Sequence, residues 1–160
     1  MTGITFKQVD VFTLKPFLGN PVAVILDGSL LSTYQMQAIA NWTNLSETTF
    51  VLPAENPDAS YKLRIFTPNS ELPFAGHPTI GSAHALLEAG LVEPKNDGTL
   101  VQECGAGLLT LTVGKLDLGE RLISVKIPEP KFKDLSEEQV NKLEEILGTE
   151  IDRSLAPLVV

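Results

Sequence analysis

The chain has 160 residues and a mass of 17.3 kDa, a size that suits one domain of ordinary dimensions or two very small ones. Hydrophobic residues make up 43% of it and charged residues 20%, so it can bury a core and is not a disordered segment. With 12 Lys and Arg against 20 Asp and Glu, the net charge of −8 would repel a phosphate backbone, which argues against nucleic-acid binding.

Targeting signals are not evident in the sequence. The longest apolar runs are far below the roughly 18 residues that cross a bilayer. The N-terminus, MTGITFKQVDVF, lacks the basic and apolar regions of a signal peptide. A single cysteine, Cys104, cannot form an internal disulfide. We therefore expect no membrane partner and a cytoplasmic location.

Strand and helix patterns alternate along the chain. Strands are predicted over residues 3–13 and 21–26, with the turn-forming Gly19-Asn20-Pro21 between them. A helix is predicted from Ser32 to about Asn44, because Gln35 follows Ser32 at the spacing of a capping box. The remaining predictions are a surface helix over 136–147 and strands over 46–53, 60–67, 99–103, 107–114 and 120–127.

The helix predicted over residues 78–89 differs from the other two, because apolar or small side chains cover all its faces. Pro78 stands at its expected first position, and Gly90 follows its end. Only His84 and Glu88 are strongly polar. A helix without a polar face is normally buried. We therefore expect an α+β domain in which mixed strands wrap around this central helix.

Residues 71–82, ELPFAGHPTIGS, form the densest group of candidate functional residues. His77 is expected at the cap position of the central helix, directly after Gly76. Three first-turn amides would then lack acceptors within the helix and could bind a carboxylate: those of Thr79, Ile80 and Gly81. The alternative is that His77 is only a cap and Gly76 only a turn glycine. The segment lacks the lysine of a phosphate-binding loop.

Glu47 is the second candidate, because a carboxylate between a helix end and an apolar strand can be partly desolvated and suited to acid–base chemistry. The alternative is a surface glutamate at the start of a strand. His77, His84 and Cys104 do not have the spacing of a zinc site, so no metal is expected. Cys104 has no base near it in the sequence and is interpreted as a bystander.

Five segments together resemble the phenazine-biosynthesis PhzF-like family, whose fold is that of diaminopimelate epimerase. They are QVDVFT, GNPVAVI (19–25), NLSETTFV (44–51), RIFTP (64–68) and ELPFAGHPTIGSAHAL (71–86). The resemblance implies two pseudo-symmetric halves, each a mixed strand barrel around a central helix. It also implies that Glu47 shuttles a proton between two carbons of one substrate, and that His77 helps to bind and polarise that substrate.

Two departures from the family pattern limit this resemblance. Ala75 stands where the epimerases of this fold carry the first of two cysteines, so racemisation by two thiols is not expected. The D-P-x-x-G-S motif of the family's second half has no match in residues 1–160. The chain is therefore expected to be one N-terminal domain, with the second half absent. The apolar run at residues 155–160 also suggests that the chain is part of a larger protein.

The resemblance implies an isomerase-type enzyme that moves a proton on a small carboxylate-bearing substrate without a cofactor. Glu47 and His77 would be the catalytic residues, and the segment from Gly76 to Gly81 would bind the carboxylate. A non-catalytic half-domain that binds an anion or a partner is the alternative. Because a lone half would expose apolar surface, we also expect a homodimer unless the missing half covers it.

Overall fold

The computed structural model describes residues 3–116, 119–127, 133–154 and 158–159. Its contacts divide the chain into two compact units, residues 1–127 and residues 128–160. The first unit carries every candidate site residue. Its elements in chain order are β1 (Phe6–Val11), β2 (Asn20–Ile25), α1 (Thr33–Thr43), β3 (Thr48–Leu52), β4 (Tyr61–Phe66), β5 (Glu71–Leu72), α2 (Gly76–Glu88), β6 (Thr99–Cys104), β7 (Gly107–Lys115) and β8 (Arg121–Val125).

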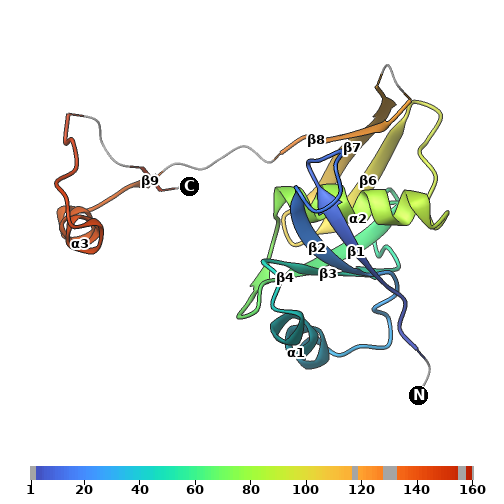
Figure 1. Ribbon diagram of the computed structural model, residues 1–160, viewed down its shortest axis with the longest axis horizontal. Coiled ribbons are helices and arrows are strands. Elements are labelled where there is room, and N and C mark those ends of the chain that lie inside the picture. The colour runs from blue at the N-terminus through green and yellow to red at the C-terminus, as the bar shows by residue number, and fades with distance from the viewer. Residues whose placement is uncertain (1–2, 117–118, 128–132, 155–157, 160) are drawn as a thin grey trace. The chain divides into compact units, whose positions relative to one another are not determined.

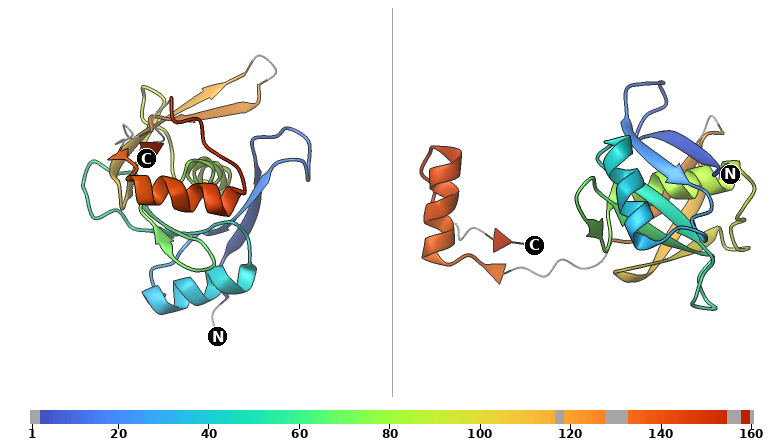
Figure 2. Two further views of the ribbon diagram at one scale, coloured as in Figure 1. Left: turned by 90° about the vertical axis from the view of Figure 1, so that its left-hand side faces the viewer. Right: turned by 90° about the horizontal axis from the view of Figure 1, so that it is seen from below.

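The strands of this unit form one mixed sheet of eight strands. Seven of them follow the order β1-β2-β3-β4-β6-β7-β8, and the short β5 pairs with β4. The β2–β3 and β4–β6 pairs are parallel and the others antiparallel. Viewed nearly along α2, the strands curve around this helix as a half-barrel (Figure 2). The α+β fold with a sheet rolled around a central helix is therefore confirmed.

Helix α2 is central because its side chains are small enough for strands to approach it closely. Seven of its 13 residues are buried: Pro78, Thr79, Gly81, Ser82, Ala83, Ala85 and Leu86. The closest approach is at Gly81, where an added Cβ would lie 2.5 Å from Cγ1 of Val22 and 2.8 Å from Cγ2 of Val11. The helix contacts β1, β2, β3 and β8.

Helix α1 packs on the other side of the strands from α2 (Figure 1). The period of two along each strand separates the two sides. Val22, Val24 and Val51 belong to the core on the α2 side. Ile25 and Phe50 pack with Met36 and Ala40 of α1. Residues that follow one another in β3 therefore face different helices.

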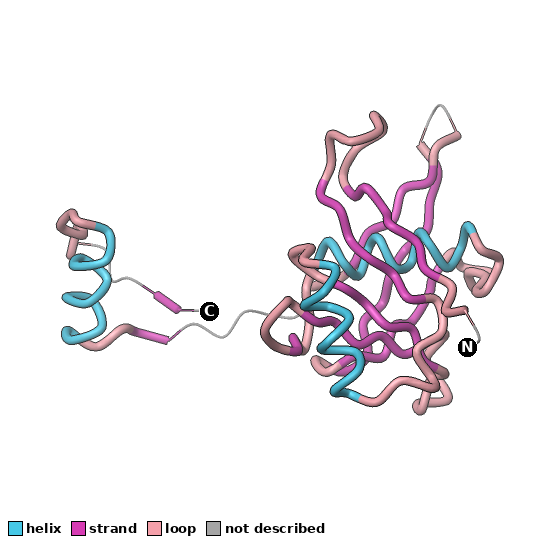
Figure 3. Tube along the Cα trace, turned by 60° about the horizontal axis from the view of Figure 1, so that its bottom comes forward, coloured by secondary structure: helices cyan, strands magenta, loops and turns pink. Residues whose placement is uncertain are grey.

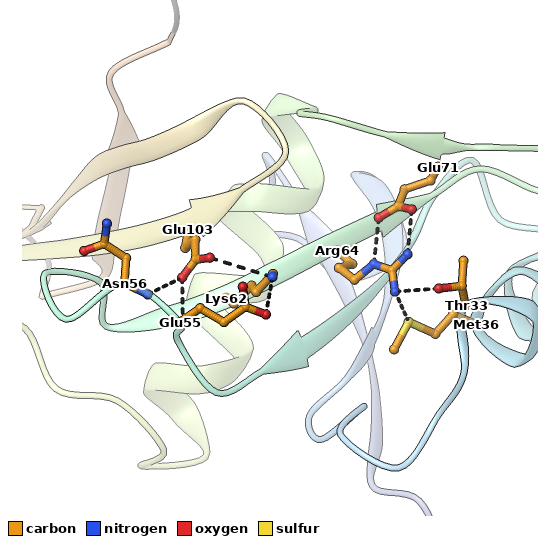
Figure 4. Close-up of polar contacts among 8 residues, drawn as sticks. All are labelled: Thr33, Met36, Glu55, Asn56, Lys62, Arg64, Glu71 and Glu103. Carbon is orange, nitrogen blue, oxygen red and sulfur yellow. Dashed lines mark hydrogen bonds and ion pairs between the residues drawn. The ribbon is translucent and has the colours of Figure 1, made fainter.

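The charged side chains of β4 form ion pairs with residues of neighbouring elements (Figure 4). Arg64 donates two hydrogen bonds to Glu71, of 2.7 and 2.6 Å, and one to Thr33 at the start of α1. Lys62 pairs with Glu55 and Glu103, and Glu103 accepts the backbone amides of residues 55 and 56. These backbone bonds lower the pKa of Glu103, as does the Lys62 charge. The contacts connect β4 to β5, β6 and α1.

The second unit contains β9 (Lys133–Asp134), α3 (Glu137–Leu147) and β10 (Leu158–Val159), of which β9 and β10 pair antiparallel. Helix α3 begins at a capping box formed by Ser136 and Gln139 and ends at Gly148 with a φ of 67°. Its bounds agree with the predicted helix. Residues 155–157 and 160 of the predicted apolar end lie outside the described residues. The expectation of one N-terminal domain over residues 1–160 stays a prediction.

Several element ends differ from the predictions. Helix α2 begins at Gly76 and not at Pro78, so Ala75 is its N-cap, and His77 is the second helical residue rather than the cap. The first strand is shorter than residues 3–13, and β5 was not predicted at all. By contrast, α1 has the expected capping box of Ser32 and Gln35 and ends at Asn44. In the described residues no helix is long and apolar enough to cross a membrane.

Candidate functional site

Glu47 lies directly before β3, and its backbone carbonyl accepts the Ala23 amide of β2 at 3.4 Å. Because side chains alternate along a strand, Glu47 falls in register with Thr49 and Val51, the residues on the α2 side. Thr48, next to it, instead forms a hydrogen bond with Thr43 of α1, with 2.7 Å between the hydroxyl oxygens. The strand start therefore directs the carboxylate toward α2.

His77 occupies the first turn of α2. The N-cap residue Ala75 has an extended backbone, with φ −152° and ψ 140°, and offers no side chain to cap the helix. The helix start is therefore fixed by the surrounding structure and not by a capping side chain. This placement brings His77, 30 residues further along the chain, next to Glu47.

The two side chains are close and largely buried. Nε2 of His77 lies 3.3 Å from Oε2 of Glu47, and the side chains are only 11% and 16% exposed. The two atoms lie within ion-pair distance, but they are not aligned as a hydrogen bond. Both atoms are buried without a hydrogen-bond partner.

Such unpartnered atoms are rare in this protein. In the part of the chain that the structure describes, three buried side-chain oxygen or nitrogen atoms lack a partner: Asp10 Oδ2, Glu47 Oε2 and His77 Nε2. Burying a polar atom without a hydrogen bond costs about 1–3 kcal/mol. Native structures retain such atoms mainly where a ligand, a water molecule or a reaction uses them. Two of these three atoms face each other at the start of α2.

Backbone amides next to this pair are also free. Among the described residues, no backbone acceptor is found for the amides of Gly76 and His77, and Pro78 has none to donate. A Cβ added to Gly76 would meet no atom within 4 Å, so the space beside it is open. The first turn of a helix carries a partial positive charge and attracts anions. These features make Gly76 and His77 the candidate positions for binding a carboxylate.

The three amides predicted to bind an anion are not the free ones. The Thr79 amide donates to the Ala75 carbonyl at 3.3 Å, and those of Ile80 and Gly81 fall within the regular bonding of α2. The earlier helix start is the cause, since it moves residues 79–81 beyond the first unsatisfied positions. Thr79 is fully buried, and its hydroxyl accepts from Gln102 at 3.2 Å. Gly81 allows the side chains of Val11 and Val22 to pack closely against α2.

The other candidates lie apart from the pair or have structural surroundings. Cys104 is buried, and its thiol contacts the carbonyl of Gly107 at 3.6 Å. His84 is half-buried, and burial, more than the nearby Arg121, lowers its pKa. Among the described residues no group of three or more His, Cys, Asp or Glu side chains gathers as a metal site.

Two cavities of about 580 and 620 Å³ lie along α2 near His84 and Arg121. The first is lined by the ends of the β1–β2 and β7–β8 hairpins, which project on the same side of the unit (Figure 3). Neither cavity is lined by Glu47 or His77. The pair is the candidate site because two buried, unpartnered atoms face each other there, whereas the first cavity is lined by one residue with such an atom, Asp10.

Sequence reasoning missed three polar residues with buried side-chain atoms, one on α2 and two on strands that contact it. Thr49 and Ser82 are fully buried and hydrogen-bonded to each other, with 2.8 Å between their hydroxyl oxygens. Asp10 carries the third unpartnered oxygen. Asp10 gave a signal, since it interrupts the apolar pattern of its strand, whereas Thr49 and Ser82 are ordinary in their segments.

Comparisons with known proteins agree with this architecture. The family model described as "Phenazine biosynthesis-like protein" matches residues 9–160. Antisense-enhancing sequence 1 of Schizosaccharomyces pombe is 50% identical over 154 residues, which are 96% of this chain and 52% of that protein. The trans-2,3-dihydro-3-hydroxyanthranilate isomerase of Pseudomonas aeruginosa is 54% identical over 82 residues, 51% of this chain and 29% of the isomerase.

A solved structure matches most of the chain. The PhzF-family phenazine biosynthesis protein of Bacillus anthracis aligns with a TM-score of 0.74 and 36% identity, covering 99% of this chain and 52% of that one. This chain therefore spans about half the length of these two broadly matching proteins. The family match extends over nearly the whole sequence, as the resemblance of its motifs predicted, and the chain belongs to the phenazine biosynthesis-like (PhzF) family.

Proposed function

We propose that the full-length protein is an isomerase that moves a proton between two carbons of a small carboxylate-bearing substrate. The observation that carries the proposal is the buried pair of Glu47 Oε2 and His77 Nε2, 3.3 Å apart and without hydrogen-bond partners. Relatives named as isomerases support the reaction class. The substrate of the Pseudomonas aeruginosa relative, by its name, is a ring that bears a carboxylate.

In this mechanism Glu47 is the acid–base group. Its carboxylate takes a proton from one substrate carbon, so that a C–H bond breaks and its electrons pass into the substrate's conjugated system. The carboxylic acid then returns the proton to another carbon, and a new C–H bond forms. Glu47 ends as it began, and the substrate keeps its number of protons and electrons. One carboxylate can perform both steps, so the proposal requires no cofactor.

His77 and the start of α2 would hold the substrate. The free amides of Gly76 and His77 would bind the carboxylate, helped by the positive end of the helix dipole. The imidazole of His77 would contact the substrate beside Glu47 and polarise it. Since Ala75 replaces a possible thiol, proton transfer by two cysteines is not part of the proposal.

Solvent-deuterium incorporation into substrate tests this function in the full-length protein. Glu47→Gln keeps the size of the side chain but removes the titrating proton, so incorporation should be abolished while binding stays nearly intact. Substituting His77 should weaken both. Residues 1–160 alone should turn over little substrate, because a misplacement of about 1 Å can cost ~100-fold. Full exchange by the Glu47→Gln protein would reject the mechanism and favour a binding role for this half.

The homodimer and the cytoplasmic location stay predictions. The loop between β1 and β2 exposes Phe12, Leu14, Phe17 and Leu18, each by 72% or more of its surface. Apolar residues clustered in this way favour association. We propose that a second copy covers them. Sedimentation of the 160-residue chain at roughly 100 μM, a range in which exposed apolar surface associates, should show a dimer. A clean monomer would contradict this.

A further inference from the structure

A buried chain of hydrogen bonds connects the two elements that carry Glu47 and His77. The hydroxyl oxygens of Thr49 in β3 and Ser82 in α2 are 2.8 Å apart. Thr49 Oγ1 also donates to the carbonyl of Ala23 in β2 at 3.3 Å. The Ala23 amide in turn donates to the carbonyl of Glu47. Ala23, Thr49 and Ser82 are all fully buried.

The direction of each hydrogen bond follows from the donors available. A threonine hydroxyl has one hydrogen, and that of Thr49 is used on the Ala23 carbonyl. Ser82 must therefore donate to Thr49. The Ser82 hydroxyl donates to the Thr49 hydroxyl, which donates to the Ala23 carbonyl. The Ala23 amide then donates to the backbone carbonyl of Glu47. The two bonds that share the Thr49 hydroxyl strengthen one another in a buried setting, whereas the Ala23 amide belongs to a different peptide group from the Ala23 carbonyl.

The spacing of the two contacts shows what this connection controls. From Glu47 to Thr49 a strand rises about 6.6 Å, at 3.3 Å per residue. From His77 to Ser82 a helix rises about 7.5 Å, at 1.5 Å per residue. The two contacts occur in the same order along β3 and α2, although His77 and Ser82, five residues apart, lie about 140° apart around the helix axis. A bond between Thr49 and Ser82 therefore limits how far α2 can slide along β3, and with it the separation of Glu47 and His77.

A second buried hydrogen bond connects α2 to another strand, at Thr79, three residues before Ser82. Gln102 of β6 is fully buried, donates to the Thr79 hydroxyl at 3.2 Å and accepts from Tyr61 of β4 at 3.1 Å. Helix α2 is thus held by polar contacts to β3 on one side and to β6 on another. The Thr49–Ser82 contact is the one that reaches the strand leading from Glu47.

We propose that Thr49 and Ser82 are positioning residues that set the geometry of the Glu47–His77 pair. The proposal rests on the proposed function for its catalytic consequence, but the geometric claim is independent of it. Neither hydroxyl would touch the substrate, since each is fully enclosed between α2 and the sheet. Because errors of about 1 Å cost ~100-fold in rate, a loosened helix would slow proton transfer more than it weakens binding.

An NMR measurement on the 160-residue chain tests the geometry directly. In the parent, Glu47→Gln should shift the ¹⁵N resonance of His77 Nε2, because the carboxylate lies beside it. In the Thr49→Val and Ser82→Ala backgrounds most of this response should be lost. Thr49→Ser, which keeps the hydroxyl, should retain it. If Thr49→Val fails to fold, Ser82→Ala decides. An undiminished response in Thr49→Val or Ser82→Ala overturns the proposal.

Ser60→Ala is the matched control. It also removes a hydroxyl from a hydrogen bond, the one that accepts the Val101 amide at 3.1 Å, but it lies before β4 and away from Glu47. Its His77 response should equal that of the parent. A loss of response in Ser60→Ala as large as in Ser82→Ala would show that general loosening is the cause and would also overturn the proposal.

Activity measurements on variants of the full-length protein distinguish failure of this proposal from failure of the proposed function. Thr49→Val should lower kcat roughly ten- to hundredfold with little change in KM, and Thr49→Ser should restore it. Equal losses in Thr49→Val and Thr49→Ser would reject the hydroxyl's role. If Glu47→Gln stays fully active, the proposed function is wrong, whereas the NMR result still decides whether the two residues set the pair's geometry.

Discussion

Helices α1 and α2 begin in opposite ways. The start of α1 is closed by side chains, because Ser32 accepts the Gln35 amide and Gln35 reaches back to the Ser32 amide. The start of α2 has Ala75 as its N-cap and no side-chain cap, and it leaves the amides of Gly76 and His77 free among the described residues. A surface helix completes its own ends, whereas this buried helix leaves its start available to a ligand.

The contrast continues along the two helices. Only Met36 and Ala40 of α1 are buried, and its other side carries exposed residues such as Tyr34 and Trp42. Helix α2 is enclosed by strands over most of its surface. The position of α2 is thus set by its surroundings rather than by its own capping residues, so its first turn can remain uncapped.

The largest expected effect comes from a charge placed within α2. Ala83 is fully buried next to Leu100 and Leu111, so Ala83→Glu should leave an unpaired charge in the core and cost several kcal/mol. We expect the protein to unfold or aggregate. In α1, Ala38 is exposed, and Ala38→Glu should change stability by less than about 0.5 kcal/mol. Matching thermal melts for Ala83→Glu and the parent would contradict the central position of α2.

An intermediate effect is expected at the capped start of α1. Ser32→Ala removes the hydroxyl that accepts the Gln35 amide and contacts the Gln35 side chain, and it should lower the free energy of unfolding by about 1 kcal/mol. Ser124→Ala on exposed β8 is a matched control and should have almost no effect. Denaturant unfolding measures both. Equal stability of Ser32→Ala and the parent would mean that α1, like α2, is held by its surroundings alone.

The smallest expected effect concerns His84 on the half-buried side of α2. Burial first, then the positive charge of Arg121, lowers its pKa below the usual 6.5, and Lys7 adds to this while Glu88 opposes it. The unfolded chain therefore binds a proton more readily than the folded one. This contribution to stability is complete above about pH 6.5 and is lost as the pH falls through the folded-state pKa.

His84→Gln removes this titration. The variant should lose less unfolding free energy than the parent between about pH 7 and pH 5, as followed by urea unfolding at each pH. Parallel pH profiles for the two proteins would show that α2 does not enclose His84 enough to affect its protonation.

The sequence predicted those parts of the fold that local chemistry determines. The bounds of α1 and α3 follow from their Ser-x-x-Gln capping boxes, which the structure contains. The start of α2 could not be predicted in this way, because Ala75 has no capping side chain. Pro78, a common first residue of helices, instead suggested a start two residues too late. Strand β5, two residues long, depends on pairing with β4 and has little pattern of its own.

The candidate site was predicted in its residues but not in its arrangement. Glu47 and His77 were each identified from local context and family motifs. Their 3.3 Å contact spans 30 positions of sequence, and only the folded chain brings them together. The prediction that the amides of residues 79–81 lack acceptors followed from the helix start at Pro78 and does not hold for a helix that begins at Gly76. Thr49 and Ser82 were missed because a threonine in a strand and a serine among alanines are ordinary in sequence.

One measurement tests most directly whether the open start of α2 and its Glu47–His77 pair form the substrate site. Amide chemical shifts of the 160-residue chain are followed by NMR during addition of benzoate, a simple ring carboxylate. The account predicts saturable shifts centred on Gly76 and His77, which Ala75→Asp should reduce because its carboxylate would occupy the same amides. Shifts centred instead on the two cavities near His84 and Arg121, or no saturable shift at Gly76 and His77, would contradict it.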